Sequence, residues 1–158
     1  NVRPALWSGP DAIAAACARV LDRATLIKLS VDDAHSLGVP STAPESVIGS
    51  FAKRTGQVVA LTDGERGVWA GKRGPAGIEF LPHVPAFPVR AVDPTGAGDA
   101  FTAALLSRLP GRPWTDIDLD DLRFAAAAGA LATTCQGAMN SLPTRQEIET
   151  LLETWGAT

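Results

Sequence analysis

The sequence predicts an α/β fold, a layered sheet with helices on both of its faces. Segments with strand character alternate with segments whose apolar residues recur at helical spacing, which is typical of this class. Residues 58–62 are almost continuously apolar, as in a strand buried on both faces of a parallel sheet. Small and polar residues follow the apolar strands at Ser30, Thr62 and Asp93. In such sheets ligands bind at the carboxyl ends of the strands.

The elements follow from local signals. Ser8-Gly9-Pro10-Asp11 is a good helix start, and Gly56 closes a later helix. Residues 63–67 form a turn after the central strand, and two short apolar runs split by residues 71–77 predict a hairpin. We expect strands at 25–30, 58–62, 68–70 and 78–81, and an extended stretch at 84–92. We expect helices at 12–21, 44–54, 98–109, 119–134 and 144–155, and a short helix that ends at residue 37.

Composition limits the function classes. The chain has 158 residues, enough for one domain with a sizeable core, and 46% of them are hydrophobic. Its net charge is −3 and no basic stripe is present, so we expect no nucleic-acid partner. The longest apolar stretches, 12–18 and 124–132, are too short to span a bilayer, so we expect no membrane partner. The chain begins at Asn1, without Met, and we expect a piece of a longer protein.

The cysteines and histidines predict neither disulfide nor zinc. Cys17 and Cys135 both fall in helical patterns, and we expect buried free thiols and a cytoplasmic location. His35 and His83 are far apart in the sequence and lack Cys or carboxylate partners at ligand spacing.

The segment Asp93-Pro94-Thr95-Gly96-Ala97-Gly98-Asp99 is the most informative motif. Its glycines let the backbone approach a ligand, and the free amides of the helix that follows favour an anion such as phosphate. Asp99 would repel that anion unless it had a role, such as accepting a proton from an attacking hydroxyl. An Asp that caps the helix after a glycine turn explains the spacing equally well.

The turns after two other strands are expected at the same sheet edge. Residues 30–33 and 62–67 supply hydroxyl, glycine and carboxylate groups, and Asp33 or Glu65 could meet a divalent cation. Each has a simpler explanation: Asp32 and Asp33 more often open a short helix, and residues 62–64 more often form a plain tight turn. The convergence of three turns on one edge favours a nucleotide site.

Several segments resemble the ribokinase-like (PfkB) carbohydrate kinases. The stretch 92–101 resembles the family's second signature, Asp-Thr-Thr-Gly-Ala-Gly-Asp, with Pro94 as a departure. Residues 1–7 look like the Asn-x-Arg-x-x-Leu-Trp segment of bacterial fructokinases and 2-keto-3-deoxygluconate kinases. Residues 27–33, 61–67 and 137–144 are similar to the family's Asn-x-x-Glu strand end, nucleotide turn and closing Gly-Ala…Pro-Thr segment.

The resemblance implies a three-layer, Rossmann-like sheet of ribokinase type. Residues 1–158 would be its C-terminal, ATP-binding portion, with the N-terminal sugar-binding half and its lid absent. It implies an ATP-dependent sugar kinase, most similar to fructokinases, with 2-keto-3-deoxygluconate as the alternative substrate. A nucleotide-binding or structural remnant without turnover is the alternative function. A homodimer is the expectation for the full-length protein.

The resemblance also implies residue roles. Asp99 would be the general base, with Gly96, Ala97 and Gly98 as the anion hole. Arg3 would reach the sugar or the transferring phosphate, and Asp33 would organise Mg²⁺ through water. Thr62, Gly64 and Gly67 would line ATP, and the segment from Ala126 to Gly137 would flank adenine. Asp93 and Thr95, together with residues 137–141, would hold a monovalent cation, commonly K⁺. Ala126 departs from the usual Asn or His, Asp33 from Glu, Ser30 from Asn, and Cys135-Gln136 from Arg-Lys.

Overall fold

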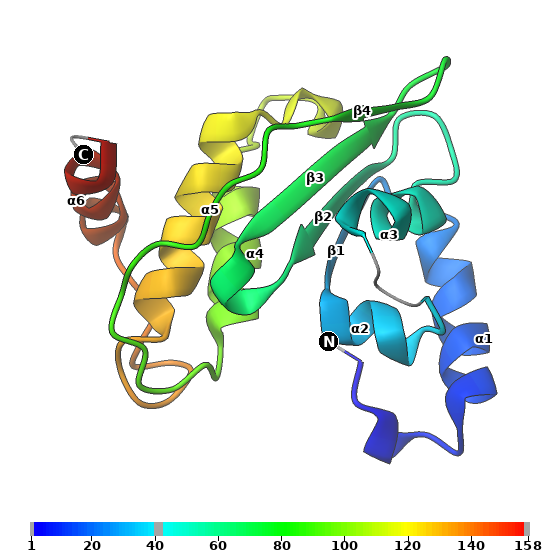
Figure 1. The fold of residues 1–158 in the computed structure, drawn as a ribbon, viewed down its shortest axis with the longest axis horizontal. Coiled ribbons are helices and arrows are strands. Elements are labelled where there is room, and N and C mark those ends of the chain that lie inside the picture. Colours follow the sequence, from blue (N-terminus) through cyan, green and yellow to red (C-terminus); the bar gives the residue numbers. More distant parts are fainter. Residues whose placement is uncertain (1, 40–42, 157–158) are drawn as a thin grey trace. The chain divides into compact units, whose positions relative to one another are not determined.

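The structure is a computed structural model that describes residues 2–39 and 43–156. The chain divides into two compact units (Figure 1). The first comprises Asn1–Asp63 and Trp69–His83, and the second Gly64–Val68 and Val84–Thr158. In the described part of the chain, no helix is both long and apolar enough to cross a membrane.

The first unit contains a sheet with the strand order β1-β2-β3-β4. β1 (Leu26–Ser30) and β2 (Val58–Thr62) are parallel, and β3 (Val68–Arg73) pairs with β4 (Ile78–Phe80) as the predicted antiparallel hairpin. The helices are α1 (Pro10–Leu21), α2 (Val31–Ser36), α3 (Pro44–Phe51) and the 3₁₀-helix η1 (Pro4–Leu6). The parallel register places Ser30 opposite Thr62, so the two strands end side by side.

One face of β1 and β2 packs against α2 and α3. Ile27 and Leu29 lie opposite Val59 and Leu61 in register, and all four are buried in one cluster with Phe51 and other helix residues. Because alternate strand residues share a face, β1 is buried at every second residue, at Ile27 and Leu29. β2 is buried along its first four residues, as its apolar run predicts.

The second unit is mainly helical. It contains the 3₁₀-helices η2 (Gly64–Arg66) and η3 (Trp114–Asp116) and the helices α4 (Ala97–Ser107), α5 (Leu119–Ala132) and α6 (Arg145–Gly156). α5 packs against both α4 and α6. The α4–α5 contact is close: a Cβ added at Gly129 would lie 3.2 Å from the carbonyl oxygen of Ala97, so a small residue is needed there.

Two sequence expectations were wrong in detail. The helix expected over 44–54 ends at Phe51, because the Gln57 side-chain oxygen accepts the amides of Lys53 and Arg54, both at 2.8 Å. Cys135 is exposed and lies beyond α5, rather than buried in a helix, and Cys17 is half-buried in α1. Both cysteines are free thiols, as expected.

Candidate active site

The segment 93–99 runs from a glycine turn into the first residues of α4, as the sequence predicts. Gly96 is the N-cap, with φ of 86°, and the amide of Ala100 donates to its carbonyl at 2.8 Å. The amide of Ala97 donates to Pro94 at 3.2 Å. The amides of Gly98 and Asp99, in the first turn, have no helical acceptor. These two N–H groups and the positive end of the helix dipole can bind an anion.

Asp99 is the third residue of α4 and is exposed. Within the described residues its carboxylate has no hydrogen bond or ion pair, so it does not act as the helix cap. The capping explanation of this residue, left open by the sequence, therefore receives no support from its contacts. A carboxylate without a partner beside free amides is available to accept a proton.

Asp93 joins the glycine turn to the loop after α5. One carboxylate oxygen, Oδ1, accepts the amide of Thr95 at 2.9 Å, and the other, Oδ2, accepts the amide of Gly137 at 3.0 Å. The amides of Val92 and Asp93 donate to the carbonyl of Thr133 at 2.7 and 3.0 Å. The Thr95 side chain, then the Gly137 and Thr95 amides, hold the pKa of Asp93 below its ordinary value.

Gly96 makes the second link between these segments. A Cβ at this position would lie 2.9 Å from both Cα and Cβ of Ala138, so the turn and the 137–141 loop touch where no side chain fits. Ser141 is buried in this loop, and its hydroxyl donates to Ala138 at 3.3 Å. The structure thus brings together Asp93, Thr95, Gly96 and Gly137, four of the predicted site residues.

The predicted nucleotide turn begins where β2 ends. The Thr62 hydroxyl donates to the Leu29 carbonyl at 3.5 Å, and Gly64 starts η2 with φ of 47°. Gly67 has φ of 93°, and an added Cβ would lie within 2.9 Å of the backbone at Pro85 and Ala86. Gly67 is therefore required by its own backbone contacts, whether or not a nucleotide binds.

Asp33 is buried in the first turn of α2 and forms a capping box with the N-cap residue Ser30. Its Oδ2 accepts the amide and the hydroxyl of Ser30, both at 2.9 Å, while the Ser30 hydroxyl accepts the Asp33 amide at 3.1 Å. Oδ1 accepts the amide of Val2 at 2.6 Å. Burial raises the pKa of Asp33, but the hydrogen bonds from Ser30 and Val2 outweigh it and hold the pKa below its ordinary value. The simpler explanation, that this Asp opens a short helix, is the one observed.

The remaining predicted residues are placed as follows. Arg3 is exposed and is the N-cap of η1, and Ala126 is buried in α5. No three His, Cys, Asp or Glu side chains within residues 2–39 and 43–156 form a group that could hold a metal ion. Sequence reasoning missed the Val2 amide and the Thr133 carbonyl, because backbone groups of distant segments leave no signal in residue spacing.

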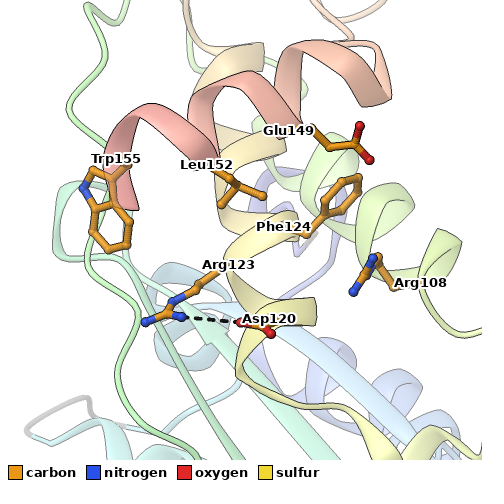
Figure 2. Close-up of a pocket in the computed structure, with 7 residues that line it drawn as sticks. All are labelled: Arg108, Asp120, Arg123, Phe124, Glu149, Leu152 and Trp155. Atoms are coloured by element: carbon orange, nitrogen blue, oxygen red, sulfur yellow. Dashed lines mark hydrogen bonds and ion pairs between the residues drawn. The ribbon is translucent and has the colours of Figure 1, made fainter. Parts of the chain in front are cut away.

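A pocket of about 690 Å³ lies elsewhere in the second unit (Figure 2). Phe124 and Leu152 line it from α5 and α6, and Arg123 pairs with Asp120 across 3.4 Å. None of the predicted site residues lines this pocket: its members are Arg108, Asp120, Arg123, Phe124, Glu149, Leu152 and Trp155.

Comparison with known proteins gives consistent matches. The family model "pfkB family carbohydrate kinase" matches residues 1–145. A fructokinase from Klebsiella pneumoniae is 36% identical over 94% of this chain and 48% of its own length. The chain spans about half the length of the first curated relatives it matches, at 47% and 48%.

Solved structures show the same fold. A Vibrio cholerae fructokinase double mutant with bound fructose, ADP and potassium has a TM-score of 0.77 and 32% identity, over 96% of this chain and 48% of that one. A protein assigned as ribokinase II from E. coli, in complex with ATP and Mg²⁺, has a TM-score of 0.77 and 30% identity, over 98% of this chain and 47% of that one. The expected α/β, ribokinase-type fold is confirmed by these likenesses.

Proposed function

Because the chain belongs to the pfkB family of carbohydrate kinases, we propose that it is the ATP-binding portion of a sugar kinase that transfers the γ-phosphate of ATP to a sugar hydroxyl. The observation that carries the proposal is the pairing of two free amides, at Gly98 and Asp99, with an exposed carboxylate that has no partner among the described residues. Fructose is the favoured acceptor, since a fructokinase is 36% identical to the chain, and 2-keto-3-deoxygluconate is the alternative.

The reaction requires a base and a stabilised phosphoryl group. Asp99 takes the proton from the sugar hydroxyl as its oxygen attacks the γ-phosphorus and ADP leaves. The Gly98 and Asp99 amides, together with the backbone at Gly96 and Ala97, stabilise the negative charge on the transferred group. The Ala97 amide already donates to the carbonyl of Pro94. We therefore assign most of the charge stabilisation to the amides of Gly98 and Asp99.

The free amides at Gly98 and Asp99 suit the phosphates of ATP. Thr62, Gly64 and Gly67 are proposed to line the nucleotide. The segment from Ala126 to Gly137 flanks the base. Since Ala126 is buried in α5, its contribution is apolar contact. Mg²⁺, when bound with ATP, neutralises charge on the phosphates. Asp33, expected to organise Mg²⁺ through water, is buried and accepts three protein donors.

A monovalent cation, K⁺ in the first instance, is proposed at Asp93, Thr95 and the 137–141 loop. The Asp93 carboxylate accepts the amides of Thr95 and Gly137 and interacts with the Thr95 side chain. It is only half-buried, so part of its surface remains open to a cation. We further propose a homodimer for the full-length protein and a cytoplasmic location, where free thiols such as Cys17 and Cys135 stay reduced.

The test measures ATP binding and ADP formation separately. Calorimetry on the chain with ATP and Mg²⁺ should show saturable binding. The full-length protein should release ADP only when a sugar is added, with fructose best in a panel that includes ribose and 2-keto-3-deoxygluconate. ATP binding without sugar-dependent ADP in the full-length protein would support the remnant instead. Absence of both would contradict the proposal.

A further inference from the structure

Asp33 connects two segments that are 31 positions apart in sequence. Its Oδ1 accepts the amide of Val2 at 2.6 Å, while its Oδ2 is used entirely within the α2 cap by the amide and hydroxyl of Ser30. In Figure 1 the dark-blue N-terminal segment passes beside the start of α2. The Val2 bond is therefore a tertiary contact, additional to what the cap needs.

The surroundings of Asp33 disfavour a cation. The residue is only 7% exposed, and three N–H or O–H donors point at its two oxygens. Donors that point at a carboxylate occupy the positions a cation or its water shell would take, and Mg²⁺ gives up its water reluctantly. Asp33 completes a capping box with Ser30 at the start of α2. Protein donors thus take three of the roughly four acceptor positions of this buried carboxylate.

Arg3 is held on both sides of its backbone. The Val2 amide precedes it and is fixed by Asp33; Pro4 follows it with a restricted φ. The Arg3 carbonyl accepts the amide of Leu6 at 3.0 Å, which closes η1. The side chain remains exposed. A fixed backbone with an exposed guanidinium lowers the entropy cost of binding an oxygen-rich ligand.

We propose that Asp33 is a positioning residue for Arg3: its Oδ1 fixes the Val2 N–H, so that the Arg3 guanidinium is presented next to the carboxyl end of β1 to a phosphate or sugar oxygen. The inference rests on the proposed kinase function for the role of Arg3. It assigns Asp33 an action through the backbone, in place of a contact with the metal.

Two pairs of variants separate the Val2 bond from the cap. Val2→Pro removes the N–H and leaves Asp33 and Ser30 in place, whereas Val2→Ala keeps the N–H. Asp33→Ala loses both the cap and the Val2 bond, whereas Ser30→Ala loses the cap hydroxyl alone. Far-UV circular dichroism would reveal whether Asp33→Ala or Ser30→Ala unfolds α2. In that case Val2→Pro and Val2→Ala still test the proposal, because they leave the cap unchanged.

The first measurement is the ¹H–¹⁵N NMR signal of Val2 in the full chain. A short bond to a carboxylate shifts an amide proton downfield. We expect this shift in the wild type and in Ser30→Ala, and its loss in Asp33→Ala. Two results would contradict the hydrogen bond between Val2 and Asp33: a random-coil chemical shift of the Val2 amide proton in the wild type, or a chemical shift that Asp33→Ala leaves unchanged. This measurement does not depend on kinase activity.

The second measurement is the kinetics of sugar-dependent ADP formation in the full-length protein. Val2→Pro and Asp33→Ala should raise KM for the sugar roughly tenfold, as expected when Arg3 loses one charge-assisted hydrogen bond to its ligand. The Mg²⁺ concentration that gives the half-maximal rate should stay unchanged. Val2→Ala should match the wild type. A higher Mg²⁺ requirement in Asp33→Ala but not in Val2→Pro would show that Asp33 serves the cation and would overturn the proposal. Absent turnover in the wild type would instead contradict the kinase function, with the NMR result still deciding the bridge.

Discussion

The Asp93 carboxylate accepts the amide of Gly137 at 3.0 Å and so joins two loops that are 44 positions apart. The other oxygen of the same carboxylate accepts the Thr95 amide at 2.9 Å. One side chain thus fixes both the entrance of the glycine turn and the loop beyond α5. We therefore expect this arrangement to position the free amides at the start of α4.

Asp93→Ala should weaken ATP binding and lower the melting temperature, because the Thr95 and Gly137 amides lose their acceptor. Asp93→Asn should lie between Asp93→Ala and the wild type, since its one carbonyl oxygen can still accept one of the two amides. Calorimetric titration with ATP and thermal melts would measure both effects. Unchanged ATP affinity in Asp93→Ala would show that the hydrogen bonds from Thr95 and Gly137 to Asp93 do not position the glycine turn.

Gly96→Ala should destabilise the second unit by roughly 2–5 kcal/mol, the sum of a left-handed φ and overpacking against Ala138. Gly111→Ala is the matched control, since Gly111 has φ of 76° with nothing within 4 Å of an added Cβ. It should cost only about 1–2 kcal/mol. Urea unfolding would compare them, and equal costs would refute the Gly96–Ala138 contact.

Asp121→Ala should destabilise the α4–α5 junction. Asp121 is fully buried, and its carboxylate pairs with Arg108 at 3.1 Å and Arg112 at 3.0 Å. Because both arginines are about one-third exposed, we expect roughly 2–4 kcal/mol, below the full cost of a buried unpaired charge.

Asp120→Ala is the control for the Asp121 prediction. Asp120 is exposed and pairs with Arg123 at 3.4 Å, so its loss should cost at most about 1 kcal/mol. Chemical denaturation of both variants gives the comparison. If Asp121→Ala were as mild as Asp120→Ala, the buried network would contribute no stability.

Acid should loosen α6 through Glu147. The Thr144 amide and hydroxyl both donate to Glu147 at 2.7 Å, and these bonds hold the pKa of Glu147 below its ordinary value of 4.5. The stabilisation is therefore complete above pH 4.5 and is lost as pH falls through the folded pKa.

Trp155 of α6 lies 4.8 Å from Phe87 and can report this loosening by fluorescence. The pH dependence should weaken in Glu147→Gln and persist in Glu149→Gln, whose parent carboxylate pairs with Arg145 at 3.6 Å. The same acid transition in both variants would exclude Glu147 as its cause.

Local sequence patterns predicted which helices and strands are present better than they predicted where each one ends. The bounds of β2 were predicted correctly, because its apolar run ends at a Thr-Asp-Gly turn. The end of α3 was missed, because the amides of Lys53 and Arg54, just beyond the helix, donate to the Gln57 side chain. α5 ends at Ala132, and beyond it the hydroxyls of Thr133 and Thr134 donate to the carbonyls of Ala130 and Leu131 at 2.7 Å.

The candidate site was predictable in its motifs but not in its tertiary links. The glycine turn and its helix were recognised from seven consecutive residues of the sequence. The bonds from Val2 to Asp33 and from Gly137 to Asp93 join a side chain to a distant backbone amide. Every residue has such an amide except proline, so residue type cannot identify which one is used.

The rate of sugar-dependent ADP formation by Asp99→Asn in the full-length protein tests the central claim most directly, with Asp120→Asn as control. A general base contributes about 10²–10⁴-fold. We therefore predict that Asp99→Asn loses at least about 100-fold in kcat and still binds ATP, while Asp120→Asn keeps the wild-type rate. Wild-type turnover in Asp99→Asn would contradict the assignment of Asp99 as the base.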